Sequence, residues 1–156
     1  MRKLAIVFLL VMVGCKRQVR GTTAPSTQPA TSANANAPGA ATHRDAVTRF
    51  FQAAKIQDVQ AMANVWGTAD RGPARSFMEP AELEMRVIYM MKCLRHDTFS
   101  IFTETPAVGD KRIFAVQVKY KNLTAMSDFT TTRGPDNRYY LELFDLEKLN
   151  VICSAS

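Results

Sequence analysis

The chain has 156 residues, of which 47% are apolar and 22% are charged, a composition typical of one globular domain. The formal net charge of +6 raises nucleic-acid binding as a hypothesis. The distribution of the charges argues against it, because five of the 20 basic residues precede residue 43 and all 14 acidic residues follow it. The remainder is nearly neutral, so we expect no basic patch that tracks phosphates and no nucleic-acid partner.

The first 15 residues have the parts of an export signal. The basic start Met1-Arg2-Lys3 precedes an apolar run at 4–13 that is too short to cross a membrane. The run ends in Met12-Val13-Gly14-Cys15, which resembles the lipobox of bacterial lipoproteins. This resemblance implies that residues 1–14 are a cleaved signal peptide. It also implies that Cys15 is lipid-modified and that palmitate is one of its acyl chains. Two or three acyl chains anchor a protein stably, so the membrane is a predicted partner.

Two alternatives to lipidation stay open. One is a plain secretory signal peptide with Cys15 near the cleavage site by chance, and the other is an uncleaved N-terminal anchor. With a lipidated cysteine, the chain is expected outside the cytoplasm, attached to the cell envelope. Lys16 directly after the cysteine resembles lipoproteins sent to the outer membrane, in an organism that has two membranes.

A low-complexity linker and one domain are predicted after the signal. From Lys16 to Thr42 the chain consists largely of Ala, Thr, Ser, Pro and Asn, and Val19 is its one branched apolar residue. Such a segment buries too little apolar surface to offset the entropy of ordering. Residues 15–42 are therefore expected to be the lipidated cysteine and a disordered tether, and residues 43–156 the domain.

Three helices are expected at the start of this domain. Thr42 with Asp45 is typical of a helix N-terminus, Asp58 suits the start of a second helix, and Pro80 suits the first turn of a third. Apolar residues recur at helical spacing on the inner faces. For the first and third helices these are Val47, Phe50, Phe51 and Ala54, and Leu83, Val87, Met90 and Leu94.

After Asp97 the apolar period changes to two, which predicts strands. The strands are expected to begin at Phe99 and to run over 114–120, 125–133 and 139–144. In the last one, Tyr139, Leu141 and Leu143 alternate with the residues between them. Residues 145–153 are expected to form a helical turn with an extended tail. Three helices followed by an antiparallel meander predict the α+β class.

Three segments resemble nuclear-transport-factor-two-like proteins, whose domain is a cone of three helices packed on a curved antiparallel sheet. They are Ala46-Val47-Thr48-Arg49-Phe50-Phe51, Val65-Trp66-Gly67-Thr68 and Arg138-Tyr139-Tyr140-Leu141. In particular the chain is similar to small bacterial lipoproteins that carry such a domain behind a linker. The resemblance implies a pocket inside the cone. This fold hosts isomerases, dehydratases, cyclases and binding modules, so it does not supply a function.

An enzyme of this fold would need a carboxylate or imidazole base facing a tyrosine hydroxyl. The weak candidate bases are His96, Asp97 and Asp128, and the candidate hydroxyls belong to Tyr120 and to three further tyrosines, Tyr89, Tyr139 and Tyr140. None lies in a recognisable catalytic motif, so no catalytic residue is predicted. His96 is expected to cap the third helix as a cation, and Asp128 to be solvated.

The chain has three cysteines and two histidines, and no metal site or cofactor is predicted. With Cys15 acylated, Cys93 and Cys153 remain in a compartment that permits oxidation. We expect a disulfide between them, and the alternative is two buried free thiols.

The leading functional hypothesis is a non-catalytic envelope lipoprotein that binds a small apolar ligand or an envelope protein. It rests on a good core pattern without an acid–base constellation. The alternatives are an isomerase, dehydratase or cyclase, which requires a closed apolar pocket with a carboxylate of raised pKa, and a structural module that forms a homodimer through its sheet face.

Overall fold

The computed structural model describes residues 37–155. The predicted signal peptide, Cys15 and most of the predicted linker lie outside these residues. The helices are α1 (His43–Lys55), α2 (Val59–Val65), α3 (Pro80–Cys93) and α4 (Asn150–Cys153), with 3-10 turns η1 (Ala74–Ser76) and η2 (Glu147–Leu149). The strands are β1 (Gly67–Thr68), β2 (Gly72–Pro73), β3 (Thr98–Pro106), β4 (Lys111–Tyr120), β5 (Leu123–Arg133) and β6 (Tyr139–Phe144).

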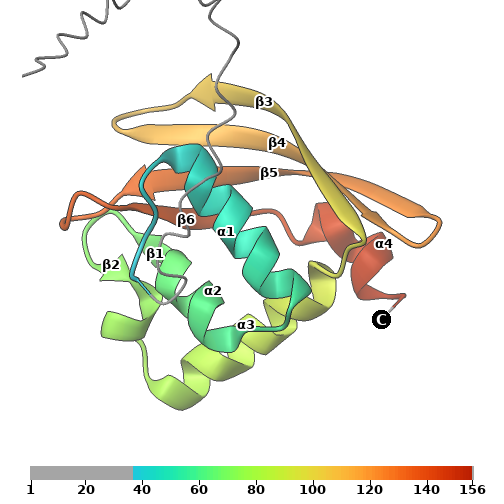
Figure 1. Cartoon of the computed structure of the whole chain (residues 1–156), viewed down its shortest axis with the longest axis horizontal. Helices are drawn as coiled ribbons and strands as arrows, with labels where there is room; N and C mark the ends of the chain where they lie inside the picture. Colours follow the sequence, from blue (N-terminus) through green and yellow to red (C-terminus); the bar gives the residue numbers. More distant parts are fainter. Residues whose placement is uncertain (1–36, 156) are drawn as a thin grey trace, which may run out of the picture. The chain divides into compact units, whose positions relative to one another are not determined.

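The domain consists of a helical layer against a four-stranded antiparallel sheet, and β1 and β2 pair as a separate two-stranded antiparallel sheet. Strands β3, β4, β5 and β6 lie side by side in chain order, and α1, α2 and α3 lie together on one side of them (Figure 1). The α+β class is confirmed. Residues 37–155 contain four α-helices rather than three, because α4 takes part of the tail. In the same range, no helix is long and apolar enough to span a membrane.

The helices begin where the sequence predicts. The backbone N–H of Asp45 donates to Thr42 Oγ1 at 3.1 Å, and the N–H of Ala61 donates to Asp58 Oδ1 at 2.9 Å. Each bond satisfies a donor that a helix N-terminus leaves without an intrahelical partner. The third helix instead begins with Pro80, whose missing N–H costs nothing in the first turn.

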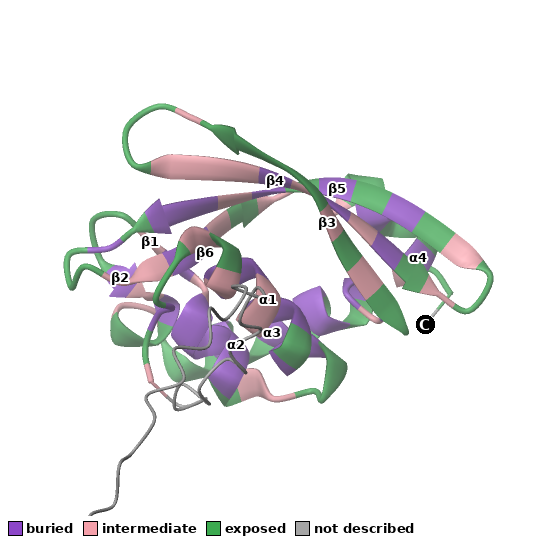
Figure 2. Cartoon of the chain, turned by 45° about the horizontal axis from the view of Figure 1, so that its top comes forward, coloured by how far each residue is buried: buried purple, intermediate pink, exposed green. Residues whose placement is uncertain are grey.

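An aromatic cluster joins α1 to the sheet. Phe51 stacks on Phe99 of β3 with ring centroids 4.6 Å apart and meets Phe129 of β5 edge-on at 5.0 Å. Phe129 in turn stacks on Phe144 of β6 at 5.2 Å, and Phe50 meets Phe144 at 5.7 Å. Buried residues accordingly gather where the helices face the sheet, while much of β3 is exposed (Figure 2). This cluster fills the inner face of the sheet.

A β-bulge interrupts the alternation of side chains in β6. Thr131 pairs with Leu141 and Thr130 pairs with Leu143, so Glu142 has no partner in the register. An extra residue moves the following side chains to the opposite face. The expected alternation of Tyr139, Leu141 and Leu143 is therefore wrong at its end, because Phe144 joins the core cluster and the Leu143 side chain is 62% exposed.

The packed region begins before residue 43, the predicted start of the domain. Ala40 is fully buried and exchanges two backbone hydrogen bonds with Tyr139, of 2.8 and 3.1 Å, at the edge of β6. Gly39 has a φ of +61°, and a Cβ there would overlap Arg138 and Tyr140. Arg49 donates to the carbonyl of Gly39. The last residues of the predicted linker thus pair with the sheet.

The sulfur atoms of Cys93 and Cys153 lie at disulfide-bonding distance, across 60 residues of sequence. Cys93 ends α3 and Cys153 ends α4, so the bond ties the helical layer to the C-terminus. Neighbouring Ile152 is fully buried, and the disulfide therefore closes one end of the core.

We expect removal of this bond to lower the free energy of unfolding by about 4 kcal/mol, the chain-entropy value for a loop of this length. The measurement is urea unfolding of the wild type and of a Cys93→Ala/Cys153→Ala variant, each with and without reductant. Reductant should lower the midpoint of the wild type and leave that of the variant unchanged. An unshifted wild-type midpoint would contradict the bond.

Candidate functional site

The candidate site is a shallow groove between α3 and the end of β6, which we call the α3–β6 groove. Its volume is about 260 Å³, and most of its lining is apolar or aromatic. The lining residues are Trp66, Arg86, Tyr89, Met90, Glu142, Leu143, Phe144 and Leu146. Ligand sites in proteins are commonly larger, roughly 300–1,000 Å³, so this groove suits one aromatic or branched apolar group rather than a large molecule.

Three features of the backbone place the aromatic and aliphatic walls of the groove. Trp66 directly follows α2 and forms a parallel bridge with Leu141, which fixes its backbone beside β6. The next residue, Gly67, lies so close to the carbonyl of Gly72 that a Cβ would overlap it. The bulge at Glu142 then directs Leu143 away from the core and into the groove.

The charged residues of the groove are engaged with neighbours. Arg86 Nη2 lies 2.6 Å from Glu82 Oε1 one turn earlier in α3. Glu142 Oε2 lies 2.6 Å from Lys111 Nζ of β4, and the Glu142 side chain is only 13% exposed. This close ion pair compensates the charge of the Glu142 carboxylate, but the buried Oε2 atom makes no hydrogen bond of regular geometry with another described residue. The groove therefore presents an apolar surface with a paired cation and a paired anion at its rim.

No family model, curated protein or solved structure matches the chain. The site is therefore assessed from its own residues.

His96 is buried just beyond the end of α3, in surroundings that disfavour its cationic form. Its Nδ1 lies 2.8 Å from the carbonyl of Leu94, which can only accept, so Nδ1 carries a proton. Nε2 is buried without a hydrogen-bond partner, and the ring meets Phe51 and Phe99 edge-on. Burial lowers the pKa of His96, and the nearby Lys55 ammonium lowers it further. The expected helix-end contact is present, through the carbonyl of Leu94, and burial disfavours the positive charge expected with it.

Three of the other candidates, Asp97, Asp128 and Tyr120, have structural contacts of their own, whereas the candidate Tyr89 lines the α3–β6 groove. The side chain of Asp97 accepts the backbone N–H of Lys121 at 2.7 Å. Asp128 is half exposed and forms an ion pair with Lys148 at 2.9 Å. The ring of Tyr120 lies 5.0 Å from the ammonium of Lys121 and packs at the border of the core. Asp97, Asp128 and Tyr120 do not line the α3–β6 groove.

A tyrosine hydroxyl does meet a carboxylate elsewhere, at the turn before β6. Tyr140 Oη donates to Asp136 Oδ2 at 2.6 Å. Burial and this carboxylate raise the pKa of Tyr140. The Tyr140 ring packs against Gly39 and Gly134, so closely that a Cβ on either glycine would overlap it. The pair therefore fastens the turn and the segment before α1 to the sheet.

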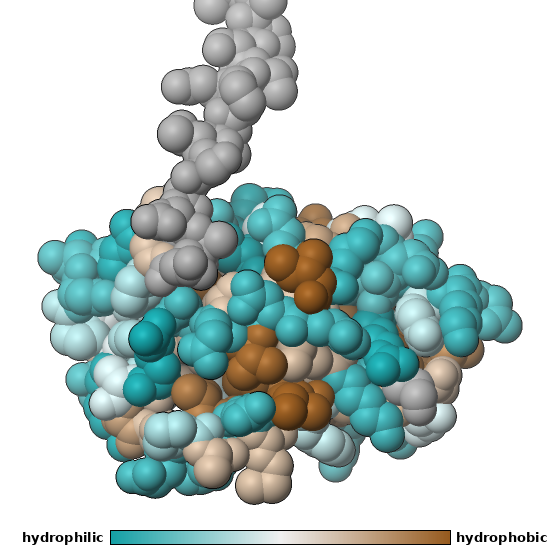
Figure 3. Space-filling model, turned by 60° about the horizontal axis from the view of Figure 1, so that its bottom comes forward, coloured by the Kyte–Doolittle hydropathy of each residue, from teal (hydrophilic) through white to brown (hydrophobic). Residues whose placement is uncertain are grey.

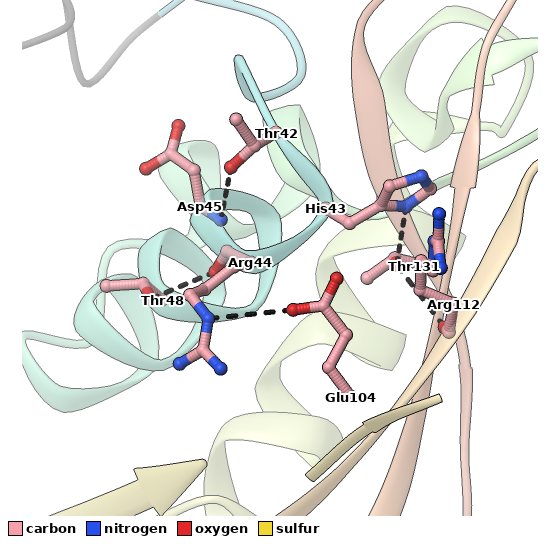
Figure 4. A network of polar contacts seen from close by, with 8 residues as sticks. All are labelled: Thr42, His43, Arg44, Asp45, Thr48, Glu104, Arg112 and Thr131. Carbon is pink, nitrogen blue, oxygen red and sulfur yellow. Dashed lines mark hydrogen bonds and ion pairs between the residues drawn. The ribbon is translucent and has the colours of Figure 1, made fainter. Parts of the chain in front are cut away.

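A polar cluster joins the N-terminus of α1 to the strands (Figure 4). His43 Nδ1 lies 2.8 Å from Thr131 Oγ1, and Nε2 lies 3.5 Å from Asp110 Oδ1. Arg44 Nε lies 3.7 Å from Glu104 Oε2 of β3. Burial lowers the pKa of His43, more than its contact with Asp110 raises it. Within residues 37–155, no group of three His, Cys, Asp or Glu side chains is placed to hold a metal ion.

The sequence contained a signal for exposed apolar surface on α3 that the prediction of this helix did not use. Met85, Ile88 and Tyr89 lie outside the predicted inner stripe of the third helix, and all three are more than half exposed. A surface helix usually has polar residues there. These three apolar residues do not belong to the core stripe and thus indicate that α3 has a second apolar side.

We expect the stability of the protein to fall in mild acid because of His96. Its pKa is lower in the folded chain than the ordinary value of 6.5, so the unfolded chain binds more protons below that pH. The contribution of His96 to the free energy of unfolding is therefore fully present above pH 6.5 and is lost as the pH falls through the folded pKa. His43 has a shift of the same sign.

Urea unfolding near neutral pH and at about pH 5 tests this expectation on the wild type and on His96→Phe. The phenyl ring fits the aromatic surroundings and does not titrate, so the variant should lose less stability between the two pH values. His43→Gln is the matched control for the other imidazole. Equal pH dependence in the wild type and His96→Phe would rule out the lowered pKa.

Proposed function

We propose that this protein is an envelope lipoprotein, anchored through Cys15, whose domain binds an apolar side chain of a partner protein in the α3–β6 groove. The observation that carries the proposal is the apolar and aromatic lining of that groove, with Trp66 and Tyr89 beside the exposed Leu143. Exposed apolar surface of this kind is typical of interaction sites. The small volume and open shape favour a side chain over an enclosed ligand.

A binding role agrees better with the chemistry of the groove than a catalytic role. Its one carboxylate, on Glu142, is held by Lys111, and the His96, Asp97 and Asp128 candidates lie elsewhere. A general base must reach the proton that it abstracts. The lining does hold the Tyr89 hydroxyl, but its one carboxylate is engaged in an ion pair with Lys111, which favours recognition over acid–base catalysis.

The nuclear-transport-factor-two-like cone is part of this proposal. Three helices, α1 to α3, packed on one side of a four-stranded antiparallel meander support it. The resemblance implies a pocket inside the cone, but here aromatic rings from α1, β3, β5 and β6 fill the inner face. We therefore place the binding surface at the rim, between α3 and β6.

Trp66 is the only tryptophan of the chain, so its fluorescence reports on the groove directly. Anilinonaphthalene sulfonate, an aromatic probe, should bind to the folded full chain and quench this fluorescence by energy transfer. Leu143→Asp should weaken the titrated affinity about tenfold or more, because it places a carboxylate in the apolar wall.

Val108→Asp is the matched control, because Val108 is 92% exposed in the turn between β3 and β4 and does not line the groove. This variant should bind the probe as the wild type does. Equal affinity in Leu143→Asp and the wild type would exclude the groove as the binding surface. Recovery of the whole chain in the soluble fraction without acyl mass on Cys15 would exclude the anchor.

A further inference from the structure

A second hollow is lined by the C-terminal part of α3 and by the turn that follows α1, and we call it the basic hollow. Its volume is about 450 Å³, within the range of small-molecule sites, roughly 300–1,000 Å³. It shares no lining residue with the α3–β6 groove. On the helical side of the domain, hydrophobic side chains gather among hydrophilic ones (Figure 3). The lining residues of the basic hollow are Gln57, Ile88, Met91, Lys92 and Arg95.

The charged side chains of the basic hollow have one sign. Lys92 lies in the last turn of α3, and Arg95 lies two residues beyond the end of this helix at Cys93. The lining contains no acidic side chain, and Arg95 forms no ion pair with another described residue. The negative end of a helix dipole amounts to about half an elementary charge, less than the full charge of Arg95 alone. The hollow therefore favours an anionic group.

The remaining helical part of the lining is apolar. Ile88 is 52% exposed, and Met91 is buried in the wall of the same hollow. An apolar wall beside a cation is complementary to an amphiphile, because the chain of such a molecule leaves water while its anionic head keeps a charged partner.

The backbone of Gln57 gives a separate reason to regard the hollow as a site. Its φ is +58°, in the left-handed region, and its N–H donates to the carbonyl of Ala54 at the end of α1. A residue of this conformation commonly ends a helix, and it is usually glycine, which has no Cβ to strain the backbone. Glutamine at this position is strained but places an amide donor in the lining of the hollow. Strain of this kind is typical of functional sites.

We propose that the basic hollow binds a single-chain anionic amphiphile, such as a fatty acid. The anionic head lies between Arg95 and Gln57, where the guanidinium can donate two parallel hydrogen bonds to a carboxylate. The apolar chain packs on Ile88 and Met91. This site goes beyond the proposed function, since it requires neither the lipid anchor nor the α3–β6 groove.

Isothermal titration calorimetry of the full chain with octanoate tests this site. Phosphatidylcholine vesicles are present to hold an acyl anchor, and the same vesicles without protein are the blank. Octanoate should bind about tenfold or more tightly than acetate, which lacks the chain, and than octanol, which lacks the charge. Affinity for either probe equal to that for octanoate would overturn the proposal.

The substitution Arg95→Gln should weaken octanoate binding about tenfold, because it removes the charged donor of the hollow. Arg71→Gln is the charge-matched control, since Arg71 lies between β1 and β2, is paired with Asp70 and does not line the hollow. Equal affinity in Arg95→Gln and Arg71→Gln would overturn the proposal. Trp66 fluorescence should stay constant in the same titration. A change in parallel with binding would place octanoate in the α3–β6 groove instead and would also overturn it.

Gln57→Gly separates binding from stability. Glycine relieves the left-handed backbone, so the urea midpoint should rise, whereas loss of the amide should weaken octanoate binding severalfold. A higher midpoint with unchanged affinity would overturn the position of the anionic head.

Phosphatidylglycerol added to the vesicles distinguishes a free amphiphile from a lipid headgroup. The ratio of octanoate affinities between the wild type and Arg95→Gln should stay the same, because the hollow remains open to the free ligand. Collapse of this ratio would show that the headgroup occupies the hollow, and it would overturn the assignment to a free amphiphile.

Discussion

The bulge in β6 is the constraint on which the rest of the domain depends. Glu142 occupies one extra position opposite β5, so the strand presents Tyr139 and Leu141 to the core before the bulge and Phe144 after it. Phe144 completes the ring stack that attaches α1 to the sheet. The same extra residue directs Leu143 outward. Core packing and the groove beside α3 thus follow from one irregularity of the backbone.

The sequence was sufficient for the features that local chemistry decides. The cap at Thr42, the cap at Asp58 and the apolar stripe of α3 need only neighbouring residues, and each was predicted at the correct position. The bulge and the burial of His96 depend on partners remote in sequence. From the sequence alone, regular alternation is predicted through Leu143, because only the stacking of Phe144 on Phe129 reveals that the strand is irregular. The burial of His96 depends in the same way on the rings of Phe51 and Phe99.

Different sides of α3 pack against the core, line the groove and face outward. Leu83 and Val87 bury it against the core, Tyr89 faces the groove, and Met85 and Ile88 face outward. Cys93 fastens its end to the C-terminus. A helix held by packing and by a covalent bond is a rigid support for recognition, and rigid support preserves the geometry of a binding surface. In the proposed lipoprotein, such a surface lies on a domain tethered to the membrane.

The most direct test of the bulge is to compare the unfolding free energies of Phe144→Ala and Leu143→Ala. We expect Phe144→Ala to lose about 2–3 kcal/mol, near the low end for aromatic core residues because Phe144 is half-buried. Leu143→Ala should stay within about 0.5 kcal/mol of the wild type, as exposed positions do. A larger loss for Leu143→Ala than for Phe144→Ala would show that the strand alternates regularly and that the groove does not exist in this form.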